Sequence, residues 1–151
     1  MKTEKDYEEL LRLFNKNKVK YCIVGAYAVG FHTVPRYTKD IDILVEPEKE
    51  NAMRIIKSLK KFGFKNIGLK TEDFYSKGKI IQLGYEPVRI DILTSLKGCT
   101  FNEVWKGRVC GAYGKEKVFF IGPKELIKSK KSTKRPVDKI DIAKLKKIQN
   151  K

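Results

Sequence analysis

The chain has 151 residues, of which 41% are hydrophobic and 11% aromatic, so the composition is that of one globular domain and excludes a disordered chain. The chain has 34 lysine and arginine residues and 18 aspartate and glutamate residues, which give a formal net charge of +16. This charge favours nucleic acids and nucleotides as partners. The alternative explanation is a thermophilic organism or an AT-rich genome, either of which raises the lysine content without a binding role. The longest uncharged stretch, residues 21–34, is too short to span a bilayer, so we expect a soluble single domain over residues 1–151 with no membrane segment.

The N-terminal half is expected to alternate helices with strands. Apolar residues at helical spacing predict an amphipathic helix over about residues 4–17. The run VKYCIVG predicts a short buried strand closed by glycine, and AYAVGFH predicts a short helix that ends before Pro35. A second strand is expected from about Ile41 to Glu46, followed by a helix that starts after Pro47 and ends near Gly63.

The C-terminal half is expected to contain a hairpin, one further strand and two helices. The runs KIIQLGY and PVRIDILTSL flank a turn at Glu86 and Pro87 and predict the hairpin. A last strand, KVFFIG, leads through Pro123 into a helix (KELIKSKK), a basic loop (STKRP) and a final helix from about Val137 to Gln149. This order predicts an α/β or α+β fold, with a mixed sheet flanked by helices and with C-terminal helices.

Cysteine usage indicates a reducing compartment. Cys22, Cys99 and Cys110 show no CxxC spacing, and an odd number of cysteines argues against a disulfide framework. The N-terminal residues show no secretory pattern, so we expect a cytoplasmic protein. With a single histidine in the chain, the sequence also argues against a structural zinc site.

Two aspartates interrupt the apolar strand in TKDIDILVEP, residues 38–47. Because side chains alternate across a strand, Asp40 and Asp42 share one face and the intervening isoleucines share the other. Asp91 repeats the pattern in VRIDILTSL, and the similar strings DIDIL and RIDIL predict neighbouring strands of one sheet. Three converging carboxylates would repel one another unless a divalent cation binds them, and two Mg²⁺ ions would support phosphoryl transfer. The alternative is a solvated strand face neutralised by nearby basic residues.

A glycine turn precedes the aspartate strand. In IVGAYAVG a buried strand ends at Gly25 where a helix begins, and the unpaired N–H groups of a helix N-terminus form a phosphate site. Gly25 and Ala26 are therefore expected to bind the phosphates of a nucleoside triphosphate. Arg36, four residues before Asp40, is expected either to reach the triphosphate or to pair with an acidic residue on the surface.

The segment VGAYAVGFHTVPRYTKDIDILVEP resembles the signature of the polymerase-beta-like nucleotidyltransferase superfamily, in which a Gly-Gly or Gly-Ser turn precedes an Asp-hydrophobic-Asp pattern. It is especially similar to AbiEii-like and minimal nucleotidyltransferases. The resemblance implies the nucleotidyltransferase fold, with two Mg²⁺ ions, or Mn²⁺, bound by the catalytic residues Asp40, Asp42 and Asp91. Ala26 departs from the family pattern, because it keeps the backbone amide of that position but not a serine hydroxyl.

The C-terminal stretch LIKSKKSTKRPVDKIDIAKL is similar to the closing motif of AbiEii-like proteins, in which a lysine and an arginine precede Asp-x-x-Asp. The resemblance implies that Lys130 and Arg135 bind phosphate and that Asp138 and Asp141 line or brace the site. A plain basic surface is the alternative for Lys130 and Arg135.

The resemblance also implies an activity. The expected reaction is transfer of an NMP from an NTP, such as ATP, to the hydroxyl of an acceptor. The expected acceptors are RNA, for example a tRNA 3′ end, or a partner protein, with small molecules as a third option, and a toxin–antitoxin or phage-defence system as the setting. The alternative function is a catalytically inactive antitoxin or RNA-binding module with the same fold.

Overall fold

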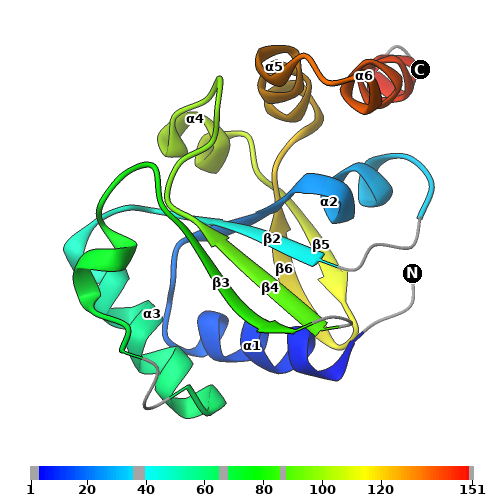
Figure 1. Cartoon of the computed structure of the whole chain (residues 1–151). Coiled ribbons are helices and arrows are strands. Elements are labelled where there is room, and N and C mark those ends of the chain that lie inside the picture. The colour runs from blue at the N-terminus through cyan, green and yellow to red at the C-terminus, as the bar shows by residue number, and fades with distance from the viewer. Residues whose placement is uncertain (1–3, 36–39, 65–67, 86–87, 150–151) are drawn as a thin grey trace.

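A computed structural model describes residues 4–35, 40–64, 68–85 and 88–149 of the chain. One mixed sheet contains six strands in the order β3-β4-β2-β1-β6-β5 (Figure 1). The strands are β1 (Tyr21–Val24), β2 (Asp40–Val45), β3 (Ile80–Tyr85), β4 (Val88–Leu93), β5 (Val109–Tyr113) and β6 (Glu116–Phe120). The helices are α1 (Lys5–Lys16), α2 (Gly25–His32), α3 (Lys49–Phe62), α4 (Phe101–Lys106), α5 (Pro123–Thr133) and α6 (Pro136–Gln149), with a 3₁₀ turn, η1, at Thr71–Phe74.

The centre of the sheet is formed by strands from both halves of the chain. β2 pairs antiparallel to β1 and parallel to β4, and β1 pairs parallel to β6. The outer pairs β3–β4 and β5–β6 are antiparallel. As a result, the aspartate strand and the strand that carries Asp91 are direct neighbours, although about fifty residues of chain separate them.

Helices pack on both sides of this sheet. Figure 1 shows α1 and α3 below the sheet, with α2, α5 and α6 above it. The apolar side chains of α1 and of the central strands form one buried cluster, which includes Leu11, Phe14, Ile41 and Ile43, each 0% exposed. Burial of these side chains is the main stabilising contribution to the fold. It also fixes the opposite face of β2 as the face that presents the aspartates.

The predicted fold class is confirmed, including the β3–β4 hairpin and the two C-terminal helices. Three elements were not predicted, namely α4, β5 and the 3₁₀ turn η1. β5 lies at the sheet edge, where its side chains alternate in exposure and Gly111 packs against the Phe31 ring, so it lacks a continuous apolar run. The predicted turn at Glu86 and Pro87 lies outside the described residues. No helix among the described segments is both long and apolar enough to cross a bilayer.

Candidate active site

Adjacent strands place the predicted carboxylates on one face of the sheet. β2 and β4 run parallel, with Asp42 paired to Asp91 and Asp40 two residues before Asp42. Because paired residues of neighbouring strands point to the same side, the three carboxylates face away from the buried Ile41 and Ile43. Asp91 is 7% exposed, whereas Asp40 and Asp42 are half-buried. The prediction that DIDIL and RIDIL form neighbouring strands is therefore confirmed.

The end of β1 brings a glycine and a helix N-terminus against these carboxylates. Val24 pairs with Asp42, and α2 begins at the next residue, Gly25. Gly25 has a φ of +68°, and a Cβ atom at this position would overlap the Asp42 carboxylate, so only glycine fits. Val24, at the N-cap, has no polar side chain to cap the helix. The first N–H groups of α2, including that of Ala26, therefore need partners, and an anion is a suitable one.

Burial and negative neighbours leave Asp42 short of positive charge. The pKa of Asp42 is raised from 3.8 to about 7, first by burial and then by the charges of Asp91 and Asp40, while Arg89 acts in the opposite direction. A hydrogen bond between the carboxyl groups of Asp42 and Asp91 adds to the increase. Near neutral pH the Asp42 carboxyl group is therefore stabilised by either a proton or a bound cation.

Arg89, which was not among the predicted site residues, lies within the acidic cluster. It is the register partner of Asp40 across β2 and β4. Its Nη2 atom lies 3.2 Å from Asp40 Oδ2 and 3.0 Å from Asp91 Oδ2, and its Nε donates to Asp91 Oδ1 at 3.3 Å. The sequence did contain one signal for this contact, because Arg89 and Asp91 are two residues apart on a strand and so share a face.

Helix α5 borders the site and leaves a cavity of about 220 Å³. Asp42 and Asp91 line the cavity together with Lys130 and Arg135. Apolar side chains form much of the remaining lining, namely Ile80, Leu93, Leu96 and Leu126. The cavity thus combines carboxylates, cations and an apolar surface within the volume of a small organic group.

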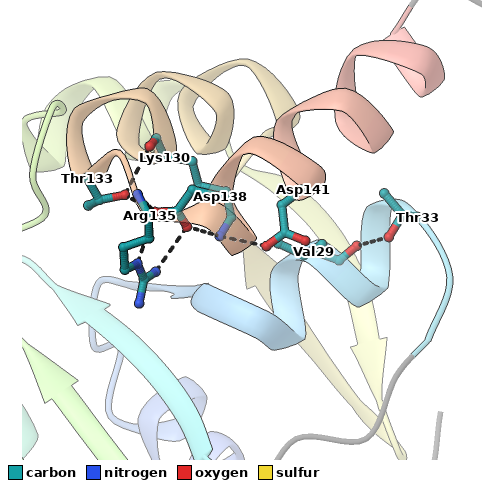
Figure 2. A network of polar contacts seen from close by, with 7 residues as sticks. All are labelled: Val29, Thr33, Lys130, Thr133, Arg135, Asp138 and Asp141. Carbon is teal, nitrogen blue, oxygen red and sulfur yellow. Dashed lines mark hydrogen bonds and ion pairs between the residues drawn. The ribbon is translucent and has the colours of Figure 1, made fainter.

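A buried ion-pair network joins α5 to α6 beside the cavity (Figure 2). Lys130 Nζ lies 3.2 Å from Asp138 Oδ1 and 3.0 Å from Asp141 Oδ2, and none of the three side chains is more than 9% exposed. Thr133 and Arg135 also donate to Asp138, the latter from Nε at 3.0 Å. These hydrogen bonds, with that of Arg135 the strongest, hold the pKa of Asp138 well below its usual range.

The predicted basic residues differ in their surroundings. Lys130 already has two buried aspartate partners, so Asp138 and Asp141 brace the wall of the cavity through it. The Arg135 side chain is 64% exposed and lines the cavity, with one side of its guanidinium held by Asp138. Phosphate binding by Lys130 and Arg135 stays a prediction, and Arg36 lies outside the described residues.

The donor set fits a divalent cation. Carboxylate oxygens are the ligands that Mg²⁺ prefers, and the charge of Arg89 does not keep the pKa of Asp42 low. In the side-chain arrangement of the described residues, no three acidic, histidine or cysteine side chains converge as a metal-binding group. Arg89 contacts two of the three carboxylates instead. Asp42 and Asp91 are therefore the residues best placed to bind a divalent cation in this arrangement.

The strand order, the carboxylates on two parallel strands and the glycine-opened helix define a nucleotidyltransferase fold. The chain is similar in structure to the lincosamide antibiotic adenylyltransferase LnuA with lincomycin bound, with a TM-score of 0.63, 21% identity, and coverage of 97% of this chain and 98% of that chain. A candidate nucleotidyltransferase from Thermotoga maritima, TM1012, gives a TM-score of 0.56 at 14% identity over 95% of this chain and 88% of that chain.

A third similar structure is ANT(2")-Ia in complex with adenylyl-2"-tobramycin, with a TM-score of 0.55, 12% identity, and coverage of 95% of this chain and 90% of that chain. No protein-family model matches the sequence, and no curated protein is significantly similar to it. The comparisons therefore establish the fold, in agreement with the superfamily resemblance.

Proposed function

We propose that the chain is a metal-dependent nucleotidyltransferase, which transfers an NMP from an NTP to an acceptor hydroxyl and releases pyrophosphate. The observation that carries the proposal is the register of β2 and β4, which sets Asp42 beside Asp91 and against the helix N-terminus at Gly25. Carboxylates and backbone N–H donors at one place suit a ligand that contains both a divalent ion and a polyphosphate. Two Mg²⁺ ions, or Mn²⁺, would supply activation of the acceptor oxygen and neutralisation of charge on the phosphates.

The role of each central residue follows from its position. The N–H groups of Gly25 and Ala26, at the N-terminus of α2, bind phosphate oxygens of the NTP. Asp40, Asp42 and Asp91 hold the metal ions. Asp91, which lines the cavity, also accepts the proton of the acceptor hydroxyl.

Two cations on α5 and in the following loop complete the proposed nucleotide site. Lys130 and Arg135 line the cavity on the side of α5 and face the phosphates. Arg135 retains an exposed edge for this purpose, because Asp138 holds only its Nε and Nη2 atoms. A planar guanidinium held in this way binds phosphate oxygens with little loss of side-chain entropy.

The proteins of the same fold support AMP as the transferred group. LnuA is an adenylyltransferase with lincomycin bound, and ANT(2")-Ia is bound to adenylyl-tobramycin. We therefore propose ATP as the first donor to test. Because this chain covers 98% of LnuA, a fold of this size also includes a protein whose bound molecule is a small antibiotic.

The charge of the C-terminal helices supports a polyanionic acceptor. Residues 124–149 contain ten basic and three acidic residues, so they carry +7 of the formal net charge of +16. Two of the three acidic residues, Asp138 and Asp141, are buried, while eight lysines of this segment are exposed. We propose RNA, such as a tRNA 3′ end, as the first acceptor, with a partner protein and an antibiotic-like small molecule as alternatives.

Arg89 favours a second candidate function. Its ion pairs with Asp40 and Asp91 give these carboxylates a cation partner from the chain itself. If these contacts persist in the presence of metal and nucleotide, the chain is a catalytically inactive antitoxin or RNA-binding module. We propose a toxin–antitoxin or phage-defence pair as the setting for either function.

Label transfer distinguishes these functions. The purified protein is incubated with Mg²⁺ and each α-labelled NTP, and the acceptors are total RNA, cell extract, lincomycin and tobramycin. The control variant is Asp6→Asn, which changes an exposed residue on α1. The enzyme is supported, and its acceptor class identified, if the wild type and this control transfer label but Asp42→Asn does not. No labelling with any acceptor, while RNA binding is retained, favours the inactive module. Equal labelling by wild type and Asp42→Asn contradicts the proposed role of Asp42 and indicates a contaminating transferase.

A further inference from the structure

Arg89 is placed so that its charge acts on the same oxygen atoms that a metal ion needs. β4 carries Arg89 and Asp91 on one face, and the parallel register sets Arg89 opposite Asp40. The Nη2 atom lies within 3.2 Å of one oxygen of each of these carboxylates, so one guanidinium links ligands on two strands. Such charge-assisted contacts are among the stronger hydrogen bonds in proteins.

The backbone of Arg89 is held firmly, so only the side chain can leave the cluster. The Tyr7 hydroxyl, from α1, donates to the carbonyl oxygen of Arg89 at 2.9 Å and accepts from its N–H at 3.2 Å. The side chain itself is 31% exposed, and the amide oxygen of the exposed Gln82 can accept from all three guanidinium nitrogens, with Nε at 2.5 Å, Nη1 at 2.9 Å and Nη2 at 3.1 Å. Gln82 lies on β3, on the side of β4 opposite to β2 and Asp40. The guanidinium therefore has a path towards solvent while β4 keeps its register.

We propose that Arg89 competes with the divalent metal ion for Asp40 and Asp91, and that metal binding requires the guanidinium to move away from these carboxylates. The inference rests on the proposed metal-dependent function of the same site. A guanidinium and a divalent cation that bind the same two carboxylates lie close together, and their positive charges repel each other. Arg89 is thus a counterion of the metal-free protein, and it lowers the metal affinity of the acidic cluster.

Binding of Mn²⁺ alone, in the absence of nucleotide, tests the competition. Affinities are measured by titration calorimetry and by the electron paramagnetic resonance signal of free Mn²⁺ for the wild type and for Arg89→Gln. The matched control is Arg12→Gln, which removes the same charge from an exposed pair with Glu9 on α1 and so corrects for the net charge of the chain. We expect Arg89→Gln to bind Mn²⁺ about tenfold more tightly than both reference proteins, which corresponds to about 1.4 kcal/mol.

A second variant covers the case in which Arg89→Gln folds poorly without metal. Arg89→Lys keeps the charge but replaces the planar fork with a single ammonium group, so its Mn²⁺ affinity should lie between those of the wild type and Arg89→Gln. Circular dichroism verifies the fold of each variant before titration.

The outcomes separate this inference from the proposed function. If Arg89→Gln binds Mn²⁺ no more tightly than Arg12→Gln while both bind it, Arg89 does not compete with the metal and the proposed function is unaffected. Weaker binding by Arg89→Gln also overturns the competition, since Arg89 would then position the ligands. If none of the proteins binds Mn²⁺ at millimolar concentration, both the competition and the metal-dependent function are wrong.

Discussion

Replacement of Asp42 by asparagine should stabilise the metal-free protein above neutral pH. The folded-state pKa of Asp42 is raised to about 7, so the folded protein retains a proton on this carboxyl group at pH values where the unfolded chain has released it. The stabilising contribution of that proton is fully present below the unfolded-state pKa of about 4 and is lost as the pH rises through about 7. Asparagine resembles the protonated form and does not titrate.

The expected size follows from the pKa. A change from 3.8 to about 7 is about three pKa units, and each unit corresponds to about 1.4 kcal/mol. Because Asp42 is only partly buried, solvent screening reduces this figure, and we expect a gain in free energy of unfolding of about 2–4 kcal/mol for Asp42→Asn at pH 8. The gain should become small near pH 4, where the carboxyl group is protonated in the folded wild type and about half protonated in the unfolded chain.

Urea unfolding in the presence of a chelator measures this difference at pH 4 and pH 8. Asp6→Asn, an exposed substitution on α1, should stay within about 0.5 kcal/mol of wild type at both values. Addition of Mg²⁺ at pH 8 should stabilise the wild type and leave Asp42→Asn nearly unchanged. A variant that is less stable than wild type at pH 8, or a difference that does not vary with pH, would refute the electrostatic account of this cluster.

Three further substitutions test the surroundings of the cluster. Gly25→Ala should reduce Mn²⁺ affinity at least about tenfold, because the added Cβ atom would displace the Asp42 carboxylate. Gly78 also has a positive φ but open space around it, so Gly78→Ala should cost about 1 kcal/mol of stability and leave Mn²⁺ binding intact. Equal Mn²⁺ affinity of the two variants would contradict the close approach of Gly25 to Asp42. Lys130→Met leaves the buried Asp138 and Asp141 without their ammonium partner and should lower the free energy of unfolding in urea by about 3–5 kcal/mol. The control Lys131→Met changes an exposed lysine and should cost less than about 0.5 kcal/mol. Similar losses for the two variants would argue against the buried network. The low pKa of Asp138 gives stability that is present above about pH 4 and is lost on acidification. The free energy of unfolding of Asp138→Asn should therefore fall less steeply below pH 4 than that of the wild type. Parallel pH profiles of the two proteins would contradict this.

Most of the fold follows from local sequence patterns. The helical spacing of apolar residues in α1 and the apolar runs of β1 and β2 are one-dimensional signals, and the structure confirms them. The edge strand β5 was missed because it is stabilised by contacts with a distant segment, whereas the short helix α4 was missed although Thr100 and Glu103 form a local capping box at its start. Packing of Phe31 against Gly111, for example, joins α2 to β5 and has no signature in either segment alone.

The candidate site was likewise predicted where it depends on a local pattern and missed where it depends on contacts between elements. Alternation along a strand was sufficient to place Asp40 and Asp42 on one face and to predict that a second strand carries Asp91 beside them. The contacts of Arg89 with Asp40 depend on the register of two strands, which the sequence does not specify. Similarly, the basic stretch around Lys130 predicts a surface cation. In the structure, the packing of α5 against α6 buries Lys130 between two aspartates.

The central claim, that the acidic cluster and the N-terminus of α2 together bind a metal–nucleotide complex, is tested most directly by crystallography. Crystals grown with Mn²⁺ and a non-hydrolysable ATP analogue are measured at the manganese absorption edge. The account predicts an anomalous peak between Asp42 and Asp91, with phosphate oxygens against the N–H groups of Gly25 and Ala26 and the Arg89 guanidinium turned away from Asp91. A nucleotide bound elsewhere, or no manganese at these carboxylates at saturating concentration, would contradict it.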